Sequence, residues 1–182
     1  GIELNILPVT ISSWKAWRAK HPKTKGLSTD TGYERPYQPG AAYGEYFSSP
    51  ELMFPVVTQD KRLSQKDYVF AMRAAGAEKA WTLAAFDGGK VINDTLGDMH
   101  IVLVGDAASR TVRAYKTESG DFSFDGPSTV KFRSATGSWE INEDALVGPD
   151  GKKLALLPGH IAFWFAWSGY KPKAAYYEAR KN

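Results

Sequence analysis

Short runs of apolar, aromatic and β-branched residues, broken by glycine-containing turns, fill the chain from about residue 68 onward. Such runs are typical of β-structure, and they predict strands at 68–72, 79–82, 101–104, 112–116, 122–124, 129–132 and 139–141. Pairs such as Gly88-Gly89 and Asp125-Gly126 supply turn chemistry between them. The pattern predicts an α+β fold with a mostly antiparallel β-sheet or small barrel, a few short helices, and one helical turn at 83–86.

Tryptophans spaced three residues apart mark a short amphipathic helix near each end of the chain. The first helix carries Trp14 and Trp17 and ends before a proline, and the second is expected over about 160–171 with Trp164 and Trp167. Residues three apart share one face of a helix, and the indole is a large apolar group. We therefore expect all four tryptophans to be buried in a core.

The two helices belong to two copies of one sequence. Residues 4–23, LNILPVTISSWKAWRAKHPK, align without a gap with residues 154–173, LALLPGHIAFWFAWSGYKPK, and nine positions are identical. A unit repeated at both ends predicts a duplicated architecture of which this chain is a remnant. Residues 1–60 would hold the closing helix of a preceding repeat and a long segment rich in Tyr, Gly and Pro. Residues 61–182 would form a β-rich repeat closed by its own tryptophan helix, and together the two parts would form one compact unit.

Composition narrows the function classes. The chain of 182 residues is 43% hydrophobic, which is enough for the core of one domain. Its net charge of +3 comes from 23 basic and 20 acidic residues that are interspersed, which argues against nucleic-acid binding. Without cysteine, these residues form no disulfide, thiolate zinc site or cysteine nucleophile. No apolar run approaches the roughly 20 residues that span a bilayer, and the common phosphate-loop, dinucleotide, zincin and serine-hydrolase motifs are absent.

A long irregular segment, residues 23–55, is the candidate ligand-binding region. Its side chains Tyr33, Arg35, Tyr37 and Tyr46 could line a groove for a planar or sugar-like small molecule. The same tyrosines could instead pin the loop through hydrogen bonds from their hydroxyls. We favour the pinning role, because aromatic residues in long loops commonly serve packing.

Candidate catalytic residues come from a short polar stretch and one histidine. Residues 91–97 are expected to form a tight turn between apolar strands, in which Asn93 and Asp94 would orient a substrate or serve the turn itself. Together with His160, they would form a hydrolase- or lyase-type pocket with His160 or Asp94 as general base. A third possibility is a metal site built from His100, His160 and nearby carboxylates.

Several strings along the chain match one known family. They include SWKAWRAKHPKT at 13–24, DTGY at 30–33, KAW at 79–81 and FWFAW at 163–167. Over nearly its whole length the chain resembles the bacterial domain-of-unknown-function family DUF3179. The resemblance implies no established activity and brings no assigned catalytic residues.

The resemblance has an architectural implication. Family members are often longer, and their preceding half carries an Asn-Asp turn, a strand and a Cys-x-x-Cys motif. The corresponding positions here fall near Asp106 and Ser109, so any thiol chemistry of that other half would be missing from this one. The chain would then be the C-terminal half of a duplicated protein.

The leading interpretation is a non-catalytic or catalytically incomplete binding or structural module of a larger bacterial protein, located in the periplasm or otherwise outside the cytoplasm. It depends on the terminal repeat, the lack of cysteine and the lack of a recognised catalytic constellation. The expected partner is the preceding repeat of the same protein, with a small-molecule ligand as a further option. The sequence leaves the cofactor unknown, and the enzyme and metal-binding alternatives stay open.

Overall fold

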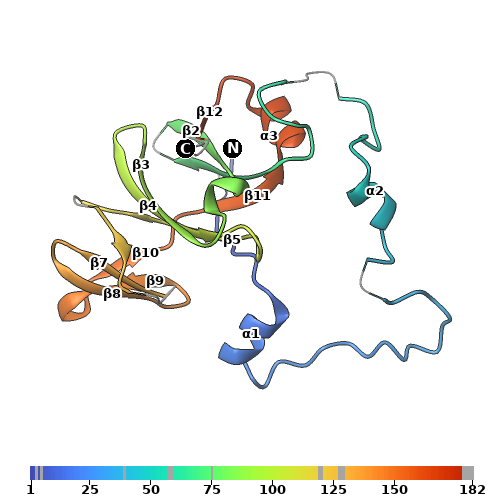
Figure 1. Ribbon diagram of the computed structural model, residues 1–182, viewed down its shortest axis with the longest axis horizontal. Helices are drawn as coiled ribbons and strands as arrows, with labels where there is room; N and C mark the ends of the chain where they lie inside the picture. Colours follow the sequence, from blue (N-terminus) through green and yellow to red (C-terminus); the bar gives the residue numbers. More distant parts are fainter. Residues whose placement is uncertain are drawn as a thin grey trace.

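Three open β-sheets stacked on one another form the body of the protein (Figure 1). The computed structural model describes residues 1–2, 4, 6–38, 40–56, 60–74, 76–118, 121–126 and 130–177. Within these residues no sheet closes into a barrel, so the barrel alternative is wrong and the mostly antiparallel sheet is confirmed. None of the described helices is long and apolar enough to cross a membrane.

The first sheet, called here the helix-backed sheet, has the strand order β11-β1-β2-β12. Its strands are β1 (Tyr68–Ala74), β2 (Ala77–Thr82), β11 (Gly159–Phe163) and β12 (Ala175–Tyr177). The β11–β1 and β1–β2 pairs are antiparallel, and β12 lies parallel to β2. The last part of the chain therefore returns to both edges of the hairpin formed by β1 and β2.

The other two sheets are antiparallel throughout. The central sheet consists of β3 (Lys90–Leu96), β4 (Met99–Asp106) and β5 (Thr111–Lys116) in that order. The five-stranded sheet has the order β10-β9-β8-β7-β6. Its strands are β6 (Ser123–Phe124), β7 (Lys131–Ser134), β8 (Gly137–Ile141), β9 (Ala145–Val147) and β10 (Lys153–Ala155).

Alternation of side chains along the strands separates the core into three layers. One layer joins the helix-backed and central sheets and includes Phe70, Trp81 and Leu103. The second joins the central and five-stranded sheets and includes Val102 and Trp139. The third, between the helix-backed sheet and helix α3 (Trp164–Tyr170), contains Val69, Ala71, Ala80, Trp164, Trp167 and Ala174. Because neighbours in a strand point to opposite faces, β1 contributes to two layers and so does β4.

The remaining helices are short. Helix α1 (Trp14–Lys20) and helix α2 (Gly44–Ser48) lie on either side of a long loop that extends away from the sheets (Figure 1). The 3₁₀ helices are η1 (Leu83–Phe86), which confirms the predicted helical turn, and η2 (Pro149–Gly151). Outside α2, the described part of the segment from 23 to 55 is irregular, as predicted.

Two sequence predictions of local structure are wrong. Residues 91–96 are not a tight turn but part of strand β3, and the turn comes after it, at residues 97–98. Residues 160–163 are not the start of a helix but part of strand β11, which pairs with β1. The seven predicted strands all coincide at least in part with observed ones, although residue 129, the start of one of them, lies outside the described residues.

The hydroxyl of Tyr115 gives a test of the second core layer. Tyr115 is fully buried, its hydroxyl has no hydrogen-bond partner within the described structure, and burial raises its pKa to about 12. An unfolded tyrosine ionises near pH 10, whereas Tyr115 in the folded protein ionises near pH 12. The folded state therefore loses stability as the pH rises from about 10 to about 12, and the total loss is about 3 kcal/mol.

We expect Tyr115→Phe to be at least as stable as the parent at pH 7, because it removes an unsatisfied buried hydroxyl. Its stability relative to the parent should then grow between pH 10 and 12. Urea unfolding of both proteins at a series of pH values measures this, and a constant difference across the series would contradict it.

Candidate functional site

Asp94 lies in the interface between the helix-backed and central sheets. Its Oδ1 accepts hydrogen bonds from Lys79 Nζ at 2.8 Å and from the Thr95 backbone N–H at 2.7 Å. Its Oδ2 accepts from Trp81 Nε1 at 2.7 Å. The carboxylate on β3 therefore binds two side chains of β2, and this arrangement ties one sheet to the other.

Asn93 faces the opposite side of the same strand. Its Nδ2 donates to the Phe122 carbonyl at 2.9 Å, and its Oδ1 accepts from the Phe122 N–H at 2.8 Å. The nitrogen and the oxygen of the Asn93 side-chain amide thus both bind the backbone of Phe122, in the segment that leads into the five-stranded sheet. Because successive side chains of a strand point to opposite faces, Asn93 and Asp94 do not converge on a common point.

His160 lies on the outer face of the helix-backed sheet, which is the face covered by α3; the inner face packs on the central sheet. His160 pairs in register with Ala71, and its ring meets that of Trp167 edge to face at 5.8 Å between centroids. Burial, and then the positive charge of Arg73, lower the pKa of His160 below its usual value, so the imidazole is neutral at pH 7. Asp94 contacts the inner face of this sheet, through Trp81, so the structure does not bring His160 to Asn93 and Asp94.

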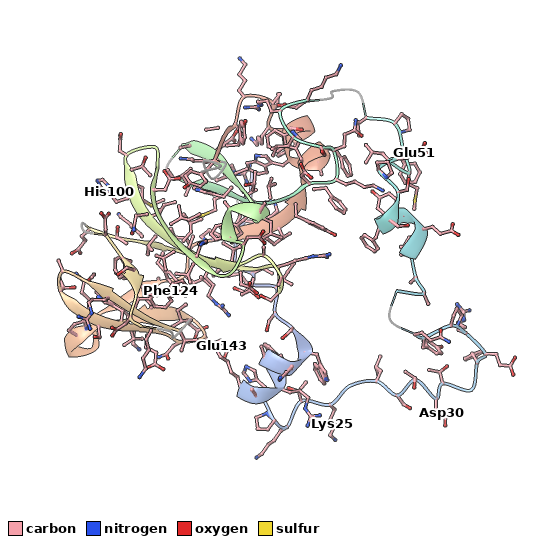
Figure 2. All side chains as sticks on the ribbon, viewed as in Figure 1. Lys25, Asp30, Glu51, His100, Phe124 and Glu143 are labelled. Atoms are coloured by element: carbon pink, nitrogen blue, oxygen red, sulfur yellow. The ribbon has the colours of Figure 1, made fainter. Side chains whose placement is uncertain are left out.

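The histidines do not assemble with carboxylates. His100 is exposed on β4, opposite Thr95 and close to the turn between β3 and β4 (Figure 2). Among the described residues, His21 contacts one carboxylate, with its Nε2 3.1 Å from Glu143 Oε1. Across the described ranges no group of three or more His, Asp or Glu side chains is placed to hold a metal ion.

The tyrosine-rich loop has its own contacts. Lys66 Nζ donates to the carbonyls of Tyr46 at 2.5 Å and Ser49 at 2.7 Å, and it stands 3.5 Å from the centre of the Tyr46 ring. The Tyr37 hydroxyl is 2.8 Å from the Thr31 hydroxyl. Tyr46 and Tyr37 thus hold separate parts of the loop.

The other two candidates of this loop, Tyr33 and Arg35, are exposed. None of the four candidate residues lines the cavities described below. The structure therefore does not gather them around one groove.

The two copies of the repeated sequence have the same local conformation. Helices α1 and α3 are each seven residues long and begin at matching positions, 14 and 164. The C-cap residues His21 and Lys171 have φ, ψ of −123°, 66° and −131°, 66°, and donate to Trp17 and Trp167 at 2.8 and 2.7 Å. The repeated sequence therefore specifies a helix with the same length and the same cap.

Their surroundings differ. Residues 159–163 pair with β1, and Trp164 and Trp167 behind them are 0% and 5% exposed. Residues 9–13, which match them in sequence, belong to no described strand, and Trp14 and Trp17 are 54% and 41% exposed. The expectation that all four tryptophans are buried is correct for the second pair and wrong for the first, because α1 is separated from strands β4 and β5 by a cavity and has no buried residue.

The N-terminal arm, residues 1–25, touches the body at few points. Thr111 Oγ1 donates to the Ile11 carbonyl at 2.8 Å, and His21 contacts Glu143, which Figure 2 shows beside α1. Much of the arm's remaining apolar surface faces solvent, including the side chains of Ile2, Leu4, Ile6, Leu7 and Val9. These described side chains place apolar surface in solvent next to the exposed indoles of α1.

A missing hydroxyl distinguishes the two copies. Trp17 Nε1 donates to Thr24 Oγ1 at 3.0 Å, whereas the residue at the matching position of the second copy is Ala174 and Trp167 Nε1 is buried without a partner among the described residues. We expect Ala174→Thr to supply the acceptor, which should make it about 1 kcal/mol more stable than a variant of the same shape without the hydroxyl.

Ala174→Val is the matched control, since valine has the shape of threonine without its hydroxyl. It should be destabilising through overpacking alone, because Ala174 is buried. Chemical denaturation of both variants checks this, and a threonine variant no more stable than the valine one would contradict it.

Two cavities border the N-terminal arm. The α1 cavity, of about 610 Å³, lies between α1 and strands β4 and β5 and includes Trp17, Asp106, Ser109, Arg113 and Glu143 in its lining. The α3 cavity, of about 380 Å³, lies between residues 6–9 and α3. Both volumes are in the range of small-molecule sites.

Asp106 and Ser109, the positions that the resemblance matched to cysteines, are in contact in the turn after β4. Ser109 donates to Asp106 Oδ2 from its hydroxyl at 2.6 Å and from its backbone N–H at 2.9 Å. The hydroxyl hydrogen bond, followed by the backbone one, lowers the pKa of Asp106 below its usual value. This pair stabilises the turn at the edge of the α1 cavity.

Stacked open sheets and few short helices define a β-rich α+β protein. The chain belongs to the family described as Protein of unknown function (DUF3179), which matches residues 1–174. Searches of curated proteins and of solved structures find no match to the chain. The family resemblance seen in the sequence is confirmed, and the family description assigns no activity.

Proposed function

We propose that the chain is a non-catalytic assembly module of a larger bacterial protein located outside the cytoplasm, and that its residues 9–20 complete the sheet of a second β-rich unit in the same polypeptide. One observation carries the proposal. Two related segments, identical at nine of twenty positions, form helices of the same length and C-cap, yet one helix is buried and the other exposed, with Trp164 at 0% and Trp14 at 54% exposure. Exposed indoles on a well-formed helix favour a role in association.

The contacts of the buried copy, β11 and α3, indicate what surface the partner of residues 9–20 would have. Strand β11 pairs with the edge of β1, and α3 then packs its tryptophans on the small side chains of Ala71 and Ala80. The partner of residues 9–20 would likewise offer an unpaired strand edge and a sheet face of small residues next to it. The preceding repeat inferred from the sequence fits this description.

A second copy of this chain fits it less well. The edge of β1 is already paired with β11, which belongs to the same chain and so competes at a high effective concentration. In addition, a Cβ on Gly159 would come within 2.3 Å of Phe70 Cζ, and the residue that matches Gly159 is Val9. Residues 9–20 therefore do not fit in the place of β11 and α3, and a different sheet is needed.

The experiment uses the natural polypeptide from its native source. Its intact mass should exceed 20.1 kDa, the mass of these 182 residues. A photo-reactive phenylalanine analogue is then placed at position 14, and the crosslinked peptides are identified by mass spectrometry. We expect a crosslink within one polypeptide, to a β-rich segment outside residues 1–182.

Two further positions calibrate the result. The analogue at position 164 should crosslink to β1 or β2, where Trp164 packs now. At position 27, whose leucine is fully exposed, no single product should dominate. A crosslink from position 14 to β1 of another copy, or a natural polypeptide of 20.1 kDa without any product from position 14, would overturn the proposal.

A further inference from the structure

The α3 cavity has an apolar floor and walls. It lies on the outer face of the helix-backed sheet, and residues 6–9 of the N-terminal arm form its far side. Small residues leave this space open, namely Ala71, Gly159, Ala162 and Ala166. The Trp167 ring adds an aromatic wall, and the exposed Tyr170 stands at the rim. A compact apolar or aromatic group would find contacts on several sides.

The polar groups in the lining are almost all hydrogen-bond donors. Arg73 is exposed, and its guanidinium has no hydrogen bond or ion pair with a described residue, whereas Trp167 Nε1 is buried without an acceptor among them. Burial, and then the charge of Arg73, lower the pKa of His160 and so favour the neutral imidazole, which can both donate and accept. Lys171 is already paired with Glu78, at 2.5 Å.

None of the described residues that line this cavity carries a carboxylate, and Glu78, which faces Arg73 across the β1–β2 pair, is held by Lys171. The α1 cavity differs in this respect, because Asp106, Glu143 and Asp144 stand beside its basic residues. An unpaired guanidinium in a cavity without acidic side chains favours an anionic guest, and the apolar floor disfavours a strongly hydrated one such as free phosphate.

We propose that the α3 cavity binds a small organic monocarboxylate with an aromatic or aliphatic body. The carboxylate pairs with the guanidinium of Arg73, and the body rests on the alanine floor against the Trp167 ring. Arginine suits this role, since its planar fork matches a carboxylate with two parallel hydrogen bonds. Of the residues that line this cavity, Val9 is shared with the segment 9–20 of the proposed assembly role, and the other contacts of the guest do not depend on that role.

Phenylacetate is the probe, and phenylacetamide, which has the same shape without the charge, is its matched control. Both are titrated into the full chain by calorimetry, with the indole N–H signal of Trp167 followed by NMR. We expect phenylacetate to bind at least about tenfold more tightly than the amide, because a charge-assisted pair is lost in the latter. Hexanoate tests whether an aliphatic body serves as well.

Arg73→Gln should weaken phenylacetate binding about tenfold or more, while Arg133→Gln, at an exposed position of β7 outside this cavity, should leave it unchanged. Arg73→Lys keeps the charge without the fork and should be intermediate, and it replaces the glutamine variant if the latter unfolds. Equal binding of acid and amide, equal binding by the parent and Arg73→Gln, or no binding of phenylacetate and hexanoate would overturn the proposal.

Discussion

Replacing Trp164 with alanine should lower the free energy of unfolding by about 3–5 kcal/mol, whereas the same change at Trp14 should cost less than about 1 kcal/mol. Trp164 is fully buried on Val69, Ala71 and Ala80, and its Nε1 donates to the Asp60 carbonyl at 3.2 Å. Removing it leaves a cavity of indole size. Trp14 occupies the matching position of the first copy but is half exposed.

Urea unfolding followed by circular dichroism measures both changes, and each variant is the other's control because both tryptophans begin a helix of the same length with the same C-cap conformation. Equal losses would mean that Trp14 is also part of a core. In a polypeptide that contains the proposed second unit, Trp14→Ala should become as costly as Trp164→Ala. That shift separates an assembly role from a merely exposed helix.

Asp94→Ala should cost about 3 kcal/mol or more. Lys79 and Asp94 have side chains only 18% and 15% exposed, so the substitution leaves a largely buried ammonium without its counter-ion. It also removes the acceptor of Trp81 Nε1. Both penalties act at the contact between the helix-backed and central sheets.

Asp94→Asn is the informative companion, since its amide oxygen can still accept from Trp81 while the negative charge is lost. Its cost should lie between those of the parent and Asp94→Ala. Asp98→Ala, in the exposed turn after β3, should be nearly neutral. Thermal unfolding in parallel checks the order, and a neutral Asp94→Ala would show that the ion pair adds nothing to the sheet contact.

Local pattern predicted most of the sheet but not strand β3. Its apolar residues Val91, Ile92 and Leu96 were evident, yet the polar pair Asn93-Asp94 and the glycine after it resembled a turn. The pair is tolerated inside a strand because each side chain finds partners far along the chain, in Trp81 and Phe122. Such partners are decided by tertiary structure, which a local pattern does not contain.

The candidate site was less predictable. His160 was singled out near the start of an expected helix, but its place in β11 puts it on the opposite side of a sheet from Asp94. Arg73, in contrast, carries no motif, and its interest comes only from the cavity around it and the lack of a partner. The sequence did contain a sign that Trp167 Nε1 lacks an acceptor, because the position of Thr24, which accepts from Trp17, is occupied by Ala174 in the second copy.

The two tryptophan helices also form an internal reference for what burial contributes to a helix. Seven residues are too few for a helix to be stable in water by itself, and α1 has no buried residue. Since length and C-cap conformation are the same in α3, amide exchange that is faster in α1 than in α3 would report the contribution of the sheet beneath α3 within a single molecule. If a partner packs on α1, amide exchange in this helix should slow, so that exchange detects the association without any label or substitution.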